Sequence, residues 1–215
     1  MSGGYSEAVT IVDTMEAYDP FYSQTWTKMA SMPLALAGHC MLQYRDSLVV
    51  VGGTTVAQRD SARILSFNIT TNLWSDLGNL SQPRVGHGCS LIERLTEHNT
   101  WKEKCSDYLY FRKNAVDIIV TGGKNNGDTL KSAENITITP LTFNVKQITS
   151  LPIRISNHVQ IDNGRTRIIG GDVSNVERDF IIEFQNPTWT MTNVTLPRNL
   201  AYHHVTRYPA NLVKC

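Results

Sequence analysis

The stretch Leu48–Thr55, LVVVGGTT, sets four apolar residues, three of them β-branched, directly before two glycines. Two further stretches have the same form: DIIVTGGK carries the pair Gly122–Gly123, and RIIGGD carries the pair Gly170–Gly171. Short β-branched runs that end in glycine are typical of buried strands followed by turns. The chain therefore repeats a strand-and-turn unit.

The glycine pairs recur with a period. Their first glycines stand at residues 3, 52, 122 and 170, so they are 49, 70 and 48 residues apart. Two of these intervals fit a repeat of about 50 residues. A glycine pair follows 13 residues after His39 but 35 residues after His87. We therefore place an insertion of about 22 residues within residues 91–113.

Each unit also carries an apolar, usually aromatic residue, a second aromatic residue, a proline and a histidine. The apolar and aromatic residues are Tyr18 and Trp26, Phe67 and Trp74, Ile138 and Phe143, and Phe184 and Trp189. The prolines are Pro33, Pro83, Pro152 and Pro197, and the histidines are His39, His87, His158 and either His203 or His204. Proline and glycine between short runs of Val, Ile, Thr and aromatic residues indicate an all-β fold with almost no helix.

The repeat resembles the kelch family over nearly the whole chain. The resemblance rests on VVVGG, AYDPFYSQTW, FNITTNLW and FQNPTW, that is, on a recurring glycine pair, aromatic residue and tryptophan. It implies a β-propeller, in which four antiparallel strands, a to d, form each blade. Residues 1–215 then make one propeller domain, and the repeated glycines, tryptophans and histidines are architectural.

The kelch strand order predicts half-blades at both ends of the chain. Strands a and b precede a glycine pair, so the chain opens with c and d, near residues 9–12 and 24–29. Three complete blades follow, and AYHHVTRYPANLVKC supplies a last a and b. Two alternatives stay open: four blades closed by the two termini, which removes exposed sheet edges, or part of a larger ring of six blades.

Composition bounds the class of partner. The chain has 20 Lys and Arg against 19 Asp and Glu, so its net charge of +1 gives no electrostatic reason to bind nucleic acid. Its apolar runs are shorter than the roughly 20 residues that span a bilayer. Neither nucleic acid binding nor a membrane span is expected.

Catalytic motifs are missing from the sequence. It contains no G-x-S-x-G, H-E-x-x-H, C-x-x-C or phosphate-binding loop. We expect no cofactor, no metal and no catalysis, and Asp128, Asp172 and Glu177 are interpreted as solvated loop residues. The alternative is a kelch-type enzyme acting on a sugar or small alcohol, for which His203 and His204 with Tyr202 and Tyr208 are the one local cluster.

The remaining hypothesis is a non-catalytic module that binds another protein. By resemblance to the family, the binding face consists of the b-to-c and d-to-a loops, and rigid scaffolds concentrate binding residues on such loops. Arginines after the prolines either recognise an acidic peptide or brace their loops. The candidate residues are Gln58, Arg59, Asp60, Arg84, Lys124, Asn125, Asp128, Arg154, Asp172, Asn175, Arg178 and Arg198.

Cysteines and sequons bear on the compartment. Four cysteines allow three pairings, of which Cys89–Cys105 is favoured because the two flank much of the insertion. Glycosylation sequons on expected outer strands begin at Asn68, Asn79, Asn135 and Asn193. GHCMLQYRDSLVVVGG resembles extracellular invertebrate kelch-repeat proteins, which favours secretion. The alternative is a cytoplasmic protein, similar to adaptors that join kelch repeats to a BTB domain.

Overall fold

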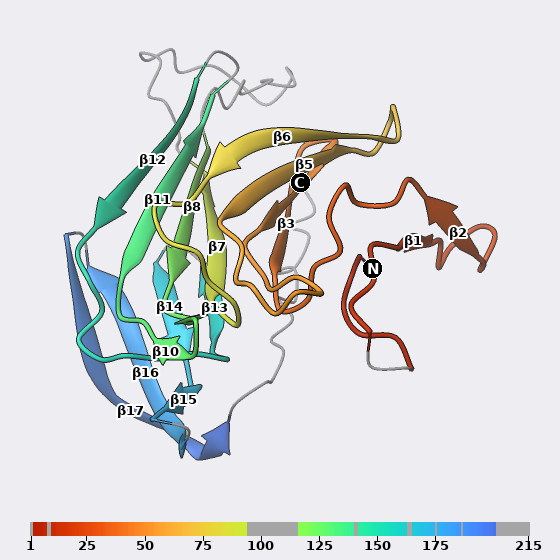
Figure 1. Ribbon diagram of the computed structural model, residues 1–215. Helices are drawn as coiled ribbons and strands as arrows, with labels where there is room; N and C mark the ends of the chain where they lie inside the picture. Colours follow the sequence, from red (N-terminus) through yellow and green to blue (C-terminus); the bar gives the residue numbers. More distant parts are fainter. Residues whose placement is uncertain are drawn as a thin grey trace, which may run out of the picture.

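A computed structural model describes residues 2–7, 10–93, 116–139, 142–162, 165–174, 176–185 and 187–200. These residues contain strands and no helix, which confirms the all-β prediction. Apart from one small two-stranded sheet in a loop, the strands form one two-stranded unit and three larger antiparallel sheets, here called the opening half-blade and blades 1, 2 and 3. Figure 1 shows them following one another along an arc.

The strand bounds follow the repeat. The opening half-blade contains β1 (Met15–Tyr18) and β2 (Trp26–Met29). Blade 1 contains β3 (Cys40–Tyr44), β4 (Ser47–Val51), β5 (Arg63–Asn68) and β6 (Leu73–Asn79). Blade 2 contains β7 (Gly88–Glu93), β8 (Val116–Thr121), β11 (Ala133–Ile138) and β12 (Phe143–Ile148). Blade 3 contains β13 (Val159–Asp162), β14 (Thr166–Ile169), β16 (Val176–Gln185) and β17 (Thr188–Leu200). Short strands in the loops are β9 (Lys124–Asn125), β10 (Asp128–Thr129) and β15 (Asp172–Val173).

Within each blade, successive strands are neighbours and pair antiparallel. The orders are β3-β4-β5-β6, β7-β8-β11-β12 and β13-β14-β16-β17. The first strands of the three blades lie side by side, since β7 contacts both β3 and β13. The blades therefore share an inner edge made of strands a, and β6, β12 and β17 are the outer strands.

The opening half-blade corrects one predicted strand. Strand c was expected near residues 9–12, but β1 lies at Met15–Tyr18, and residues 4–7 and 10–12 lie outside the named strands. The register of β1 and β2 places Tyr18 opposite Trp26, with ring centroids 5.1 Å apart. The closing strands predicted in residues 201–215 lie outside the described residues.

The hydrophobic core lies between blades rather than within one sheet. Strand β4 is buried on both sides: Val49 and Val51 pack in a cluster with blade 2, and Val50 packs in a cluster with Leu36, beside the opening half-blade. Strand β8 is buried along its whole length. Trp74 is half-buried in the same cluster as Val50, and its Nε1 donates to the Ala30 carbonyl at 2.8 Å.

The glycine pairs make room for the repeated histidines. Gly52 has φ +62°, and a Cβ at this position would lie 2.7 Å from Cε1 of His87, in the next blade. Gly53 has φ +102°, and its Cβ would lie 2.9 Å from the Ala37 carbonyl oxygen. Both the backbone conformation and the close approach require glycine. A buried strand thus ends in two glycines because His87 of the next blade lies against Gly52, and the Ala37 carbonyl and His39 lie against Gly53.

Candidate functional site

The four b-to-c loops, one in each unit, form small hairpins. In each, the residue after the glycine pair bridges antiparallel to a residue shortly before strand c. We call residues 4–7 with 10–12, 54–60, 124–129, and 172–174 with 176–177 hairpins 1 to 4, respectively. The bridged pairs are Tyr5 with Ile11, Thr54 with Asp60, Lys124 with Thr129, and Asp172 with Glu177.

The d-to-a loops anchor these hairpins. Thr54 of hairpin 2 bridges to Ala37, Lys124 of hairpin 3 bridges to Val85, and Asp172 of hairpin 4 bridges to Ser156. The anchoring residues, Ala37, Val85 and Ser156, occupy the same place in successive units. Main-chain hydrogen bonds therefore fix hairpins 2, 3 and 4 each to the loop that enters its own blade.

A second set of main-chain bonds links one unit to the next. The Gly86 N–H donates to the Gly38 carbonyl at 3.0 Å, and the Asn157 N–H donates to the Gly86 carbonyl at 2.7 Å. All three residues have positive φ, between 52° and 61°, a conformation that glycine and asparagine adopt most readily. The loops of successive blades are thus joined in series, and the face they form is pre-organised.

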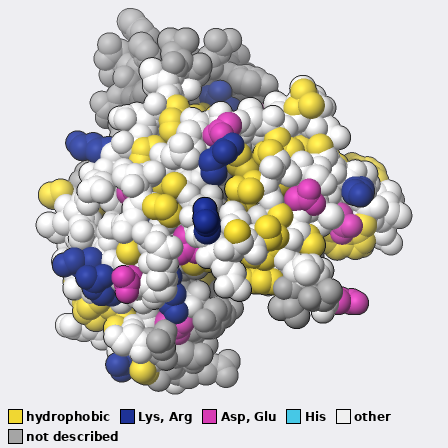
Figure 2. Space-filling model, viewed as in Figure 1, with side chains coloured by type: hydrophobic (Ala, Val, Ile, Leu, Met, Phe, Trp, Pro, Cys, Tyr) yellow, Lys and Arg dark blue, Asp and Glu magenta, His cyan; other side chains and the backbone are white. Residues whose placement is uncertain are grey.

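Many of the predicted binding residues are available on this face. Gln58, Arg59, Asp128, Arg154 and Arg178 are exposed, and Asp60, Lys124 and Asn125 are partly exposed. The Asp60 carboxylate accepts from the Asn126 N–H at 2.7 Å, which joins hairpin 2 to hairpin 3. Asn175 and the side chain of Arg198 lie outside the described residues. Figure 2 shows acidic and basic side chains interspersed over the face in view.

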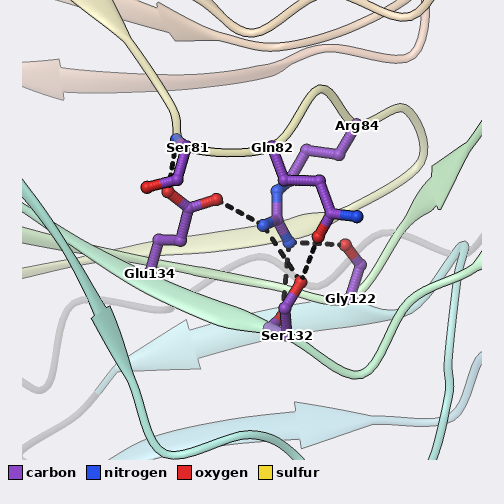
Figure 3. A network of polar contacts seen from close by, with 6 residues as sticks. All are labelled: Ser81, Gln82, Arg84, Gly122, Ser132 and Glu134. Atoms are coloured by element: carbon purple, nitrogen blue, oxygen red, sulfur yellow. Dashed lines mark hydrogen bonds and ion pairs between the residues drawn. The ribbon is translucent and has the colours of Figure 1, made fainter.

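Arg84 is not part of the exposed face, and its prediction as a binding residue is wrong. Its side chain is fully buried and forms an ion pair with the equally buried Glu134 (Figure 3). Its guanidinium also donates to the Gly122 carbonyl at 2.8 Å and to Ser132. The second Glu134 oxygen accepts from the Ser81 N–H at 2.7 Å. Arg84 therefore braces the junction between blades 1 and 2, as the alternative interpretation of the repeated arginines expected.

Asp172 is also wrong as a binding residue. It is buried, and its carboxylate accepts from the Asn157 amide at 2.8 Å. Arg154 combines both interpretations: it is exposed, and its guanidinium donates to the Thr129 carbonyl of hairpin 3 at 2.8 Å. The Asp172 carboxylate is thus engaged within the protein, whereas Arg154 remains on the surface.

The repeated histidines pack against glycines between the blades. His87 is buried and sits against Gly52 of blade 1 and Gly123 of its own blade. Burial, with Arg84 and the neighbouring histidines nearby, lowers the pKa of His87 to about 3, so its ring is neutral at physiological pH. Burial likewise lowers the pKa of His39. Among the described residues, no three His, Cys, Asp or Glu side chains are grouped to hold a metal. Nor does that part of the chain contain a helix long and apolar enough to cross a bilayer.

The disulfide differs from the predicted one. Cys89 of β7 is bonded to Cys40 of β3, with Cα atoms 6.2 Å apart, and not to Cys105, which lies outside the described residues. The Cys89–Cys105 pairing was predicted because these cysteines flank much of the insertion, without considering which strands are neighbours at the inner edge. Because first strands of neighbouring blades lie side by side, cysteines one repeat apart come within bonding distance.

The sequons do lie on strands c and d, with unequal exposure. Asn79 and Asn193 are exposed on outer strands. Asn68 is half-buried, and its Oδ1 accepts from the Thr71 N–H. Asn135 is half-buried with a buried Oδ1.

Sequence reasoning missed a pocket between hairpins 1 and 2. It has a volume of about 220 Å³ and is lined by Tyr5, Thr10, Ile11, Thr54, Val56 and Gln58. Only Gln58 was among the predicted residues. A usable signal was present, because Tyr5 and Val56 are apolar residues in short loops rather than in strands.

Two comparisons identify relatives, and no family model matches the chain. Kelch-like ECH-associated protein 1A of Danio rerio is 33% identical over 98 residues, which is 43% of this chain and 16% of that protein. The chain thus spans about a sixth of the length of this curated relative. The solved structure of YjhT superposes with a TM-score of 0.71 at 13% identity, covering 93% of this chain and 68% of that chain.

The fold defines the class: sheets of antiparallel strands around a common inner edge, matching a solved propeller, make this chain a β-propeller. The glycine pairs, the aromatic pairs and the match to the curated relative make the chain similar to kelch-repeat proteins.

Proposed function

We propose that this chain is a non-catalytic interaction module that binds a partner protein through hairpins 1 to 4 and the d-to-a loops. The observation that carries the proposal is that main-chain hydrogen bonds hold the loop hairpins to the d-to-a loops. A surface fixed in this way loses little conformational entropy on binding. The name of the curated relative describes it as associated with another molecule, which supports an interaction role.

Charge indicates the kind of partner. Arg59 and Arg154 are exposed on the loops and Arg178 is exposed near the start of β16, whereas Asp172 is buried and Asp60 accepts a main-chain hydrogen bond. Arginine offers a planar set of donors that matches a carboxylate. We therefore expect a partner segment that carries acidic side chains.

The compartment belongs to the same proposal. We place the protein outside the cytosol, as a secreted glycoprotein. Support comes from the Cys40–Cys89 disulfide, since disulfides persist mainly in oxidising compartments. The exposed sequons at Asn79 and Asn193 are the most accessible candidates for glycans.

The test compares two double charge reversals. Proteins retained from an extract of the source organism are quantified on wild type, on Arg154→Glu/Arg178→Glu, and on the outer-strand control Lys28→Glu/Lys146→Glu. We expect a retained protein to be depleted at least about tenfold by the loop variant and not by the control. Equal loss on both variants, or stoichiometric transition metal in the purified protein, would contradict an interaction-only function.

A further inference from the structure

The pocket between hairpins 1 and 2 has the size of a side-chain site. Its volume of about 220 Å³ is below the roughly 300–1,000 Å³ of pockets that hold drug-sized ligands. Both hairpins contribute to it: Tyr5 and Ile11 from hairpin 1, Val56 and Gln58 from hairpin 2. It therefore lies on the face proposed above to bind a partner protein.

One substitution within the repeat explains why this junction is open. Ile11 and Asp60 occupy the same place, each bridged to the residue that follows a glycine pair. Asp60 reaches the next hairpin and accepts the Asn126 N–H at 2.7 Å, which closes the junction between hairpins 2 and 3. Ile11 has no polar group that can form such a bond, so the junction between hairpins 1 and 2 stays open and apolar.

The pocket exposes apolar surface that the fold does not use. Tyr5 is 63% exposed and Val56 is 67% exposed. Thr10, Thr54 and Gln58 surround them with hydroxyl and amide groups. An apolar centre with a polar rim is the arrangement found at protein interfaces, where a buried anchor residue contributes most of the affinity.

The charge of Arg59 indicates which kind of partner residue lies beside the anchor residue. Arg59 follows Gln58 on hairpin 2 and is exposed. The nearest carboxylate on that hairpin, Asp60, is already engaged by the Asn126 N–H. An exposed cation therefore follows the pocket-lining Gln58 on the same hairpin, and its charge complements an acidic side chain on a bound segment.

We propose that this pocket takes one aliphatic or aromatic side chain from an extended segment of the partner protein, with an Asp or Glu adjacent to it that pairs with Arg59. This inference rests on the proposed function and specifies the chemistry that the same face recognises. The anchor inserts between hairpins 1 and 2 and is covered by Tyr5 and Val56.

The probe is a phage-displayed library of random 12-residue peptides, panned on the purified wild-type chain. Enriched peptides are synthesised and titrated against wild type, Val56→Glu, Val56→Ala and Arg59→Gln. Val176→Glu is the matched control, because Val176 is 49% exposed on hairpin 4, away from the pocket. Thermal melting of each variant checks that an exposed substitution leaves the fold intact.

We expect an enriched motif with an apolar residue next to Asp or Glu, a loss of affinity of at least about tenfold in Val56→Glu, and a smaller loss in Val56→Ala and Arg59→Gln. Binding to Val176→Glu should match wild type. Peptides that bind Val56→Glu normally but lose affinity in Arg154→Glu/Arg178→Glu would overturn the pocket and leave the proposed function standing. Absence of any enriched peptide, or peptides insensitive to every loop variant, would overturn both.

Discussion

The junction between blades 1 and 2 and the junction between blades 2 and 3 share one backbone arrangement and differ in what fills it. Arg84 faces Glu134 at the first junction, and both are fully buried. At the second, Ile155 and Ile182 occupy the same two positions and belong to one apolar cluster. The repeat therefore fixes where two side chains meet, while their chemistry varies from junction to junction.

The inner edge shows the same contrast. Cys40 and Cys89 join β3 to β7 covalently. Between β7 and β13, Gln160 occupies the place of Cys89, and its amide donates to the Ser90 hydroxyl and the Ile119 carbonyl, each at 2.9 Å. A disulfide at one junction is thus replaced by a hydrogen-bond network at the other, and both hold neighbouring blades together at the inner edge.

The largest expected effect comes from breaking the ion pair on one side. Arg84→Leu leaves Glu134 buried without its cation, so we expect the free energy of unfolding to fall by about 3 to 5 kcal/mol. Arg84→Leu/Glu134→Leu copies the Leu36–Leu65 pair of the junction before blade 1 and should restore most of this loss. Urea unfolding followed by tryptophan fluorescence measures both. A single variant within about 1 kcal/mol of wild type would show that the pair is not buried as described.

The disulfide should matter less. Cys40 and Cys89 are 49 residues apart, and we expect Cys40→Ala/Cys89→Ala to lower the free energy of unfolding by about 2 to 4 kcal/mol. A reductant should destabilise wild type by a similar amount and leave the double variant unchanged. If reduction affects both proteins equally, the cross-link between blades 1 and 2 is not its target.

The smallest effect is the pH dependence that His87 contributes at the first junction. The His87 pKa is lowered to about 3 in the folded protein, against about 6.5 in an unfolded chain. Below pH 6.5 the unfolded state binds a proton that folded His87 does not, so stability is complete above pH 6.5 and falls towards pH 3. We expect a loss of about 2 kcal/mol between pH 8 and pH 5. His87→Gln should be less stable at pH 8 and show a flatter profile between pH 7 and 5; parallel profiles would contradict this assignment.

The sequence determines the parts of this fold that recur. Gly52, His87 and Trp74 have counterparts one repeat away, so their architectural role follows from the period and from the conformational freedom of glycine. The first strand c was misplaced because residues 9–12 have the β-branched character of a strand, yet Ile11 is bridged to Tyr5 in hairpin 1, before β1.

The candidate site was only partly predictable because it depends on residues that break the repeat. Arg84 follows a proline as the exposed Arg154 does, but the buried partner with which it pairs, Glu134, lies 50 residues away. The Cys40–Cys89 bond required knowing that first strands are neighbours. The pocket required comparing Ile11 with Asp60, and that equivalence appears only once both are seen bridged to the residue after a glycine pair.

The Arg84–Glu134 pair also makes incorrect arrangements of the blades less stable than the correct one while the chain folds. Every junction offers similar glycine–histidine contacts, so a blade that docks on the wrong neighbour still finds a backbone that fits. Blade 2 misdocked on Leu36 would enclose the Glu134 carboxylate without a cation, and blade 3 misdocked on blade 1 would enclose Arg84 against Ile182. Each such misassembly leaves a buried charge without its partner, at a cost of several kcal/mol. One ion pair in the middle of the arc thereby enforces the order of parts that otherwise look alike.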